Sequence, residues 1–244
     1  MKVFFLCFVV LLLLLVSYEY LTLPDVSSLK RENPKQTALM QQRAQEAQTA
    51  GRKLKKNQIW VPYHSISSYL KSAILIGEDD AFYHHEGYDL EQIKESFIKN
   101  WEKKGWVRGG STITQQLAKN LYLSTSKNPL RKLKEFLIAR RLEEELSKGR
   151  IFEIYLNVIE WGHGIYGAEA ASRTYFAKSA LDLNVKEAVL LAAIIPSPRR
   201  ISPLRQTTRL RSRVDLILSR MVQYHHISQE EYQAACNTEE ESQP

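Results

Sequence analysis

Glu78 stands where residues able to do chemistry are densest in the sequence. The stretch from Gly77 to Asp89, GEDDAFYHHEGYD, holds five acidic residues and two histidines in thirteen positions. A metal site is disfavoured, because the adjacent His84 and His85 would point to different sides of most backbones and no His-x-His or His-x-x-x-His pair occurs. The stretch is therefore either a charged surface loop or the seat of a catalytic carboxylate.

The apolar run SAILIG before Glu78 favours the catalytic alternative. A helix that buries Ile74 and Leu75 would carry Glu78 to the edge of the core, where desolvation and the neighbouring charge of Asp79 would raise its pKa. A carboxylate with a raised pKa is suited to remove a proton from a substrate. The sequence therefore predicts Glu78 as a general base.

A second cluster, RGGSTITQQLAKNLYL, runs from Arg108 to Leu123 and pairs two glycines with a helix start at Ser111. Glycines let the backbone approach a ligand, and the first-turn N–H groups of a helix favour an anion. Gln115 and Lys119 fall on one face, which we expect to point toward solvent or substrate. The opposite face is apolar and comprises Ile113, Leu117 and Leu121. Glycines before a Ser/Thr cap are usually structural, so the polar face is what indicates a binding site.

A third cluster, NPLRKLKEFLIARRLEEEL, predicts a long helix that starts at Asn128 and Pro129 and ends near Leu146. Helical spacing places Glu135 on one stripe with Arg131 and two apolar residues, Ile138 and Leu142. A carboxylate in that position requires a cation, and Arg131 is the nearest. A semi-buried ion pair and a functional role explain this spacing equally well.

The rest of the chain after Ile59 shows helical spacing and no clear period-two strands. Capping signatures open helices at Asp89 with Gln92, at Asn184 with Glu187 and at Ser228 with Glu231. The predicted fold class is all-α, with one mostly helical domain over residues 58–236 and a tail over 237–244.

The N-terminus carries fourteen uninterrupted apolar residues, Val3 to Val16, which predict a transmembrane helix. No Ala-x-Ala cleavage site follows, so a retained anchor over residues 1–23 is favoured over a cleaved signal peptide. Lys2 before the run, with Glu19 after it, places the N-terminus in the cytoplasm. Residues 24–57 have few large apolar side chains and are expected to form a solvated stem.

The composition of the chain limits the classes of partner that it could bind. A formal charge of +7 and a pI near 9.3 indicate an anionic partner, which nucleic acid, a membrane surface or a phosphorylated substrate would satisfy. Only two cysteines occur, Cys7 and Cys236, so neither an intrachain disulfide nor a cysteine-based zinc site is expected.

Taken in order, these clusters resemble the family 51 glycosyltransferases that polymerise peptidoglycan. The family motif Glu-Asp-x-x-Phe-x-x-His-x-Gly-x-Asp is matched by Glu78, Asp79, Phe82, His85, Gly87 and Asp89. The motif Gly-Gly-Ser-Thr-Ile-Thr-Gln-Gln is matched without change from Gly109 to Gln116, and Arg-Lys-x-x-Glu falls on Arg131, Lys132 and Glu135. The segments KGRIFEIYLN, ending at Asn157, and GIYGAEAASRTYF resemble the fourth and fifth motifs. The later EAVLLAAIIPSPRRISP resembles the short monofunctional members of Gram-negative inner membranes.

The resemblance implies a mostly helical, lysozyme-like fold on the periplasmic side of the inner membrane, held by a single-pass anchor. It implies that the enzyme transfers the lipid-linked nascent glycan onto the 4-hydroxyl of the N-acetylglucosamine of lipid II, with inversion and release of undecaprenyl pyrophosphate. No tightly bound cofactor is implied, and the resemblance is compatible with a divalent cation, Mg²⁺ or Mn²⁺, near Glu135. Cell-division or elongation proteins are left open as partners, and nucleic acid is not expected outside the cytoplasm.

The resemblance also implies roles for individual residues. Glu78 is the general base, and Glu135 positions cations or a metal instead of acting as an acid. The implied substrate-binding residues are Ser111, Thr112, Gln115, Gln116, Lys119, Asn120, Lys127 and Arg131. The implied structural residues of the motifs are Asp79, Phe82, His85, Gly87, Gly109, Gly110, Lys132 and Asn157.

Two other functions fit parts of the pattern. A lytic or hydrolytic enzyme of lysozyme-like fold would use Glu78 as an acid on finished peptidoglycan, although finished glycan offers no pyrophosphate for the cations around Lys119 and Arg131. A basic, membrane-tethered binding module would bind anionic lipid or nucleic acid in a salt-sensitive way without needing Glu78 or Glu135.

Overall fold

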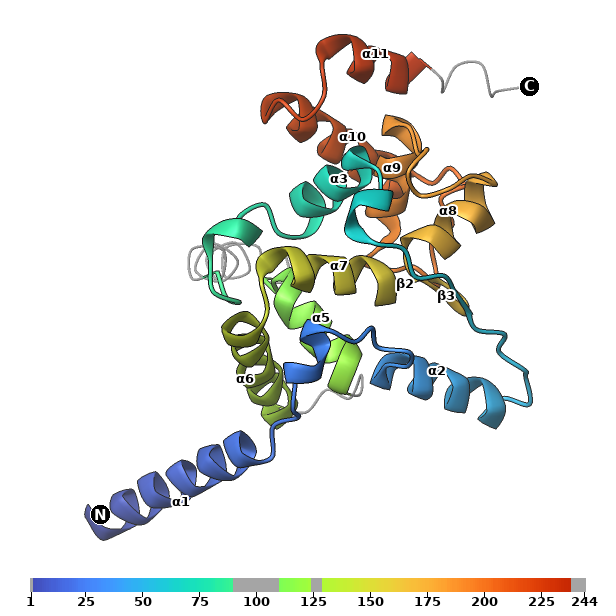
Figure 1. The fold of residues 1–244 in the computed structure, drawn as a ribbon. Helices are drawn as coiled ribbons and strands as arrows, with labels where there is room; N and C mark the ends of the chain where they lie inside the picture. Colours follow the sequence, from blue (N-terminus) through green and yellow to red (C-terminus); the bar gives the residue numbers. More distant parts are fainter. Residues whose placement is uncertain (1, 90–109, 124–128, 238–244) are drawn as a thin grey trace.

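The structure is a computed structural model that describes residues 2–89, 110–123 and 129–237 (Figure 1). The described helices are α1 (Lys2–Leu21), α2 (Ala38–Thr49), α3 (Ser68–Glu78), α5 (Ile113–Tyr122), α6 (Pro129–Glu145), α7 (Lys148–Val158), α8 (Ala168–Phe176), α9 (Val185–Ile194), α10 (Thr208–Gln223) and α11 (Gln229–Asn237). Short 3₁₀ turns occupy Ser27–Lys30, Tyr63–Ser65 and Phe82–His84. The mostly helical prediction is confirmed.

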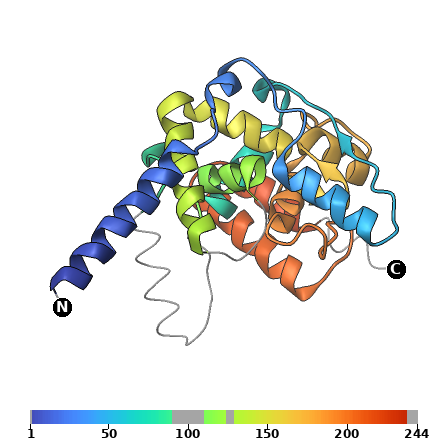
Figure 2. The same cartoon turned by 90° about the horizontal axis from the view of Figure 1, so that it is seen from below.

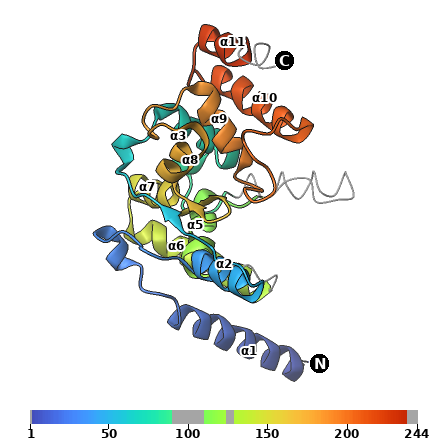
Figure 3. The same ribbon diagram turned by 90° about the vertical axis from the view of Figure 1, so that its right-hand side faces the viewer.

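Two groups of helices make up the body. In the first, α3, α9 and α10 pack on one another, and in the second, α5 packs on α6 and α7 (Figures 1 and 3). Both groups share one apolar core, whose largest buried side chains include Trp161, Tyr155 and Phe152. Trp161 donates its indole N–H to the carbonyl of Leu191 in α9 at 3.0 Å, so even this buried polar group is satisfied.

The helix starts follow the sequence signals closely. Asn184 and Glu187 form a reciprocal capping box at α9, and Ser228 and Glu231 exchange the same pair of hydrogen bonds at α11. At α5 the prediction is wrong by one residue, because Thr112 and not Ser111 accepts the capping hydrogen bond from Gln115 N–H. The helix predicted to open at Asp89 lies outside the described residues.

A small sheet, which the all-α prediction missed, closes one side of the body. Its strands are β1 (Asn57–Gln58), β2 (Glu160–Gly162) and β3 (Ile165–Tyr166), in the order β1-β3-β2, with β1 parallel and β2 antiparallel to β3. Strands of two or three residues are too short to show a period-two pattern. The β2–β3 turn passes under residue 55, because a Cβ built on Gly164 would lie 2.5 Å from the carbonyl oxygen of Lys55.

Residues 24–57, predicted as a solvated stem, are instead packed on the body. Val26, Leu29 and Met40 are buried in the core, and α2 packs on α5. Arg150 of α7 fixes the segment from the other side. Its guanidinium donates to the carbonyls of Leu29 and Glu32 at 2.8 and 2.9 Å and to Oδ1 of Asn33 at 2.8 Å. The prediction failed because a few well-placed apolar residues suffice to bury a segment whose composition is polar.

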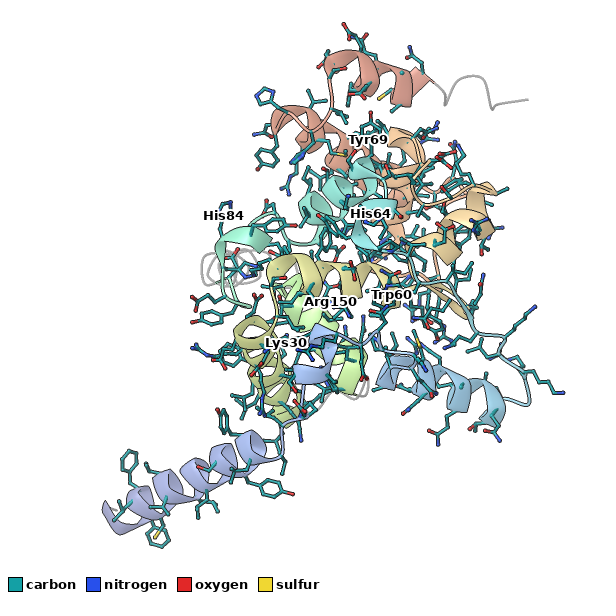
Figure 4. All side chains as sticks on the ribbon, in the orientation of Figure 1. Lys30, Trp60, His64, Tyr69, His84 and Arg150 are labelled. Atoms are coloured by element: carbon teal, nitrogen blue, oxygen red, sulfur yellow. The ribbon has the colours of Figure 1, made fainter. Side chains whose placement is uncertain are left out.

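The guanidinium of Arg150 also lies over the ring of Trp60, 5.6 Å from its centroid (Figure 4). Lys30 in the same segment pairs with Glu145 at the end of α6, at 2.5 Å. The segment that follows α1 is therefore joined to both α6 and α7.

Helix α1 projects from the body and packs against α6 near its own C-terminal end (Figures 1 and 2). Across the described residues, none of the helices combines the length and the apolarity needed to cross a membrane.

Asn157, at the end of α7, provides a test of this architecture. Its side chain is buried, accepts from Val61 N–H at 2.9 Å and donates to the carbonyls of Val61 and Glu153 at 2.9 Å each. Asn157→Ala would leave both backbone groups of Val61 without partners, so we expect the free energy of unfolding to fall by about 2–4 kcal/mol. Denaturant unfolding in detergent measures this loss. Asn57→Ala, which removes one exposed hydrogen bond to Thr174, serves as the control and should change stability by much less. An equal effect of both substitutions would contradict the assignment.

Candidate active site

Glu78 is the last residue of α3, and the body of that helix explains its position. Ala73, Ile74 and Ile76 are buried and Leu75 is half-buried, so α3 ends at the core with Glu78 at the edge, as predicted. The Glu78 side chain is only 10% exposed. It does not face bulk solvent.

Two partners hold the Glu78 carboxylate. Nη2 of Arg213 in α10 donates to Oε1 at 2.5 Å, and Nε2 of Gln116 in α5 donates to Oε2 at 2.9 Å. Burial raises the pKa of Glu78 above its ordinary value, although Arg213, Gln116 and Lys119 all act to lower it and Asp79 adds to the increase. The carboxylate is therefore a stronger base than a surface glutamate and is still stabilised in its charged form.

Gln116 is itself oriented from behind. The hydroxyl of the buried Tyr155 in α7 donates to Oε1 of Gln116 at 3.0 Å, which leaves the amide N–H₂ facing Glu78. Burial raises the pKa of Tyr155 well above its ordinary value, so this phenol stays a donor. The orientation of Gln116 is thus set by two different helices.

Asp79, next to Glu78, has a structural role in holding the end of α3 to the start of α5. Its Oδ2 accepts from the backbone N–H of Ile113 at 2.8 Å, at the start of α5, and its Oδ1 accepts from Nε2 of His85 at 2.9 Å. Because Nδ1 of His85 accepts from Gly87 N–H at 3.1 Å, Nε2 carries the proton. Thr112 Oγ1 then donates to the carbonyl of Gly87 at 2.8 Å. This closed set of hydrogen bonds joins the end of α3 to the start of α5.

Phe82 and Gly87 complete that loop. Phe82 is buried, lies 5.6 Å from the ring of Phe152 and has Lys148 Nζ 4.4 Å from its centroid. Gly87 has φ of +87°, and a Cβ there would lie 3.1 Å from Cγ of Glu143. Both motif residues therefore shape the segment over residues 79–89 that follows Glu78.

Glu135 in α6 forms the second charged centre. Its side chain is 4% exposed, and its two oxygens accept from Nη1 of Arg131 at 2.7 Å and from Nζ of Lys132 at 2.5 Å. Ile138 and Leu142 on the same stripe are buried, as the spacing predicts. Lys132 also donates to Ser111 Oγ at 3.0 Å, so it joins Glu135 to the start of α5.

Lys119 lies between the two acidic centres. Burial lowers its pKa below the ordinary value for lysine, while the charges of Glu135 and Glu78 act in the opposite direction. Within the described part of the chain, no hydrogen bond or ion pair engages its ammonium group. Lys119 is thus a half-buried cation in the electrostatic field of Glu78 and Glu135.

The chain is similar in sequence to known proteins over most of its length. The sequence model of the family described as Transglycosylase matches residues 43–222. This chain belongs to the transglycosylase family. Curated relatives called biosynthetic peptidoglycan transglycosylase are 44% identical in Methylobacillus flagellatus, over 86% of this chain and 92% of the relative, and 47% identical in Nitrosospira multiformis, over 78% and 82%. The relative from Thiobacillus denitrificans is 48% identical over 76% and 80%.

Among solved structures, the crystal structure of penicillin-binding protein 1A from Haemophilus influenzae is similar to this transglycosylase. It is 23% identical, with a TM-score of 0.41, over 74% of this chain and 17% of its own.

Several predicted binding residues of the transglycosylase are placed differently from expectation. Gln115, expected to point outward, is buried, and its Oε1 lies 3.4 Å from Lys132 Nζ. Thr112, expected to contact substrate, is buried and uses its hydroxyl to cap α5 and bond Gly87. Asn120 is also buried, and Gly110 and Ser111 are half-buried at the start of α5. Gly109 and Lys127 lie outside the described residues.

A divalent cation does not fit the donors described around Glu135. Both carboxylate oxygens already accept from cationic groups, and a metal would have to displace Arg131 or Lys132. Over the described ranges, no group of three or more His, Cys, Asp or Glu side chains could hold a metal ion.

Arg213 and Tyr155 are site residues that the sequence analysis missed. Arg213 lies in α10 beside the buried stripe of Leu210, Val214 and Ile217, and it also donates to the carbonyl of Gly77 at 3.2 Å. The only sign of Arg213 in the sequence was its position as an arginine at the edge of an apolar helical stripe. It could not be paired with Glu78, because 135 residues separate the two.

The ion pair between Glu78 and Arg213 yields a prediction that needs no substrate. Arg213→Gln removes the charge that most strongly lowers the pKa of Glu78, so that pKa should rise further above its ordinary value. Carboxyl-carbon NMR titration of glutamate-labelled protein measures it, with the Glu78 signal assigned by its loss in Glu78→Gln. Arg220→Gln is the control, because Arg220 lies on the same helix and faces Asp80 at 4.0 Å. A Glu78 pKa that falls or stays constant in Arg213→Gln would refute this account.

Proposed function

We propose that this chain polymerises the glycan strands of peptidoglycan. It transfers the lipid-linked nascent glycan onto the 4-hydroxyl of the N-acetylglucosamine of lipid II, inverts the anomeric carbon and releases undecaprenyl pyrophosphate. The observation that carries the proposal is a buried carboxylate of raised pKa, Glu78, which is electrostatically coupled to Lys119 of α5, while Lys119 is coupled in turn to Glu135, Arg131 and Lys132 of α6. Membership of the transglycosylase family and relatives called biosynthetic peptidoglycan transglycosylase support it.

Glu78 acts as the general base in this proposal. Its carboxylate takes the proton of the acceptor 4-hydroxyl, whose oxygen then attacks the anomeric carbon at the lipid-bearing end of the growing chain. The new glycosidic bond forms as the bond from that carbon to pyrophosphate breaks, and the single displacement inverts the centre. Arg213 and Gln116 position the carboxylate and keep it charged before the proton arrives.

Cations on α5 and α6 neutralise the departing pyrophosphate. Lys119 is the first candidate, because its ammonium is half-buried in a position where a phosphate oxygen would relieve the cost of its burial. Arg131 and Lys132 follow, with Glu135 fixing both side chains instead of donating a proton. Lys127 remains a proposed contact on sequence grounds.

Membrane attachment through residues 1–23 belongs to the same proposal. The fourteen apolar residues Val3 to Val16 support a retained anchor in the inner membrane with the body in the periplasm. Phe4, Phe5, Leu6 and Leu11 of α1 are exposed to their surroundings and do not pack on the body. A substrate carried on a lipid gives the enzyme a reason to stay at the bilayer.

Replacing the proposed base tests the mechanism directly. Glu78→Gln keeps the size of the side chain and removes its basicity, so polymerisation of lipid II should fall by about 10²–10⁴-fold. Gel analysis of the polymer formed from labelled lipid II measures the rate. The matched control is Asp80→Asn, a neighbouring carboxylate outside the site that should keep nearly full activity. Near-normal turnover by Glu78→Gln would remove Glu78 from the role, and release of fragments from finished peptidoglycan would indicate a lytic enzyme instead.

Lys119→Ala tests the neutralisation of pyrophosphate. Loss of one preorganised cation should slow polymerisation by about 10²–10³-fold. Lys71→Ala is the control, because burial also lowers the pKa of Lys71, yet its ammonium faces Tyr63 and not the site. If both variants polymerise lipid II at the same rate, Lys119 has no special part in the reaction.

Deleting residues 2–21 tests the anchor. We expect the full chain to stay with inner-membrane vesicles in alkaline carbonate and the shortened chain to be released, since removal of the apolar run removes the main favourable contact with lipid. Immunoblots of pellet and supernatant measure the distribution. Release of the full chain under the same conditions would refute a retained transmembrane anchor.

A further inference from the structure

A cavity of about 270 Å³ lies between α2, the residues that follow it and the β2–β3 turn. It shares no residue with the site around Glu78 and Glu135. Its charged lining residues are Arg43, Glu46, Arg52, Lys53, Glu160 and Arg199. The wall is fixed by the close approach of residue 55 to Gly164 and by the 2.8 Å hydrogen bond from Asn57 N–H to the Gly164 carbonyl.

Glu160 is the buried polar group of this cavity. Its side chain is only 5% exposed, and Oε2 accepts from Nε of Arg43 at 3.2 Å. Its other oxygen, Oε1, is buried without a hydrogen-bond donor among the described residues. Directly across the strand pair, the hydroxyl of Tyr166 is also buried and unpartnered there. Buried polar atoms in folded proteins are normally paired, so a carboxylate oxygen in this state indicates a missing donor.

Two cations complete the arrangement. Arg43 and Arg199 already pair with Glu46 at 3.0 and 3.1 Å. Arg52 and Lys53 are exposed, and no acidic side chain in the described part of the chain lies within ion-pair distance of either one. The cavity therefore combines an oxygen that lacks a donor with two cations that lack an anion.

We propose that this cavity binds a small zwitterion, namely a free amino acid or a short peptide that carries both an ammonium and a carboxylate. The ammonium donates to Glu160 Oε1, and the carboxylate pairs with Arg52 and Lys53. A simple anion would satisfy the two cations and leave Glu160 Oε1 unpaired and repelled. A metal ion would find only two carboxylates, Glu46 and Glu160, and arginines already pair with both, which is a poor set of ligands. The proposal does not depend on the polymerase function.

Three matched peptides separate the two ends of the ligand. Diglycine carries both charges, N-acetyl-diglycine lacks the ammonium and glycylglycinamide lacks the carboxylate. Isothermal titration of the full chain in detergent should show binding of diglycine and at least about tenfold weaker binding of each capped peptide, since each cap removes one charged hydrogen-bonding group.

Variants assign each end to its residues. In Glu160→Gln, diglycine and N-acetyl-diglycine should bind with similar affinity, because the partner of the ammonium is gone. In the double variant Arg52→Ala/Lys53→Ala, diglycine and glycylglycinamide should become similar. These two exposed positions leave the core untouched, so this arm stands even if Glu160→Gln fails to fold. Lys55→Ala, the neighbouring exposed lysine, is the control and should bind as the unaltered chain does.

Three results would overturn the proposal. The first is no binding of diglycine at millimolar concentration, which would mean that the cavity holds only solvent. The second is equal affinity of the unaltered chain for diglycine and N-acetyl-diglycine. The third is unchanged discrimination against glycylglycinamide in the Arg52→Ala/Lys53→Ala variant.

Discussion

The burial of one carboxylate is the constraint on which the rest of the site depends. A charged group at the edge of an apolar core is costly unless it is paired, and Glu78 is paired with Arg213 from α10 and Gln116 from α5. Those two contacts come from the two separate groups of helices. The Glu78 carboxylate therefore fixes the positions of α3, α5 and α10 relative to one another. The same packing buries the carboxylate and raises its pKa.

The adjacent carboxylates show how neighbours in sequence acquire different tasks. Asp79 accepts the first backbone N–H of α5 and the Nε2–H of His85. Its carboxylate therefore joins the start of a helix to a loop. Glu78 faces the other way, and its two oxygens accept from Arg213 and Gln116. A helix that ends between the two residues separates them, because the backbone turns at Asp79 and sends the side chains in different directions.

The amino-acid sequence was sufficient to predict those features of the fold and the site that depend on local residue patterns. Helical spacing and capping signatures located α5, α6, α9 and α11, and the apolar run before Glu78 predicted the burial of that residue. Contacts between segments that are distant in sequence could not be predicted in this way. Neither Arg213 on Glu78 nor Tyr155 on Gln116 has a local signal, since each pair is joined only by the fold. The small sheet was missed because its strands have only two or three residues, and β1 pairs with a strand more than a hundred residues away. The packing of residues 24–57 was missed because Arg150, which holds them, also lies more than a hundred residues away.

The way in which the chain leaves α1 has a mechanical consequence. Leu23 is buried two residues after α1 ends, Val26 and Leu29 follow it into the core, and Arg150 holds the backbone beyond them. The first helix is therefore joined to the body without a long linker. If a bilayer holds α1, it also sets the tilt of the body and its height above the lipid headgroups. A rigid mount of this kind would keep the reacting centre at one depth, where successive lipid-borne sugars arrive.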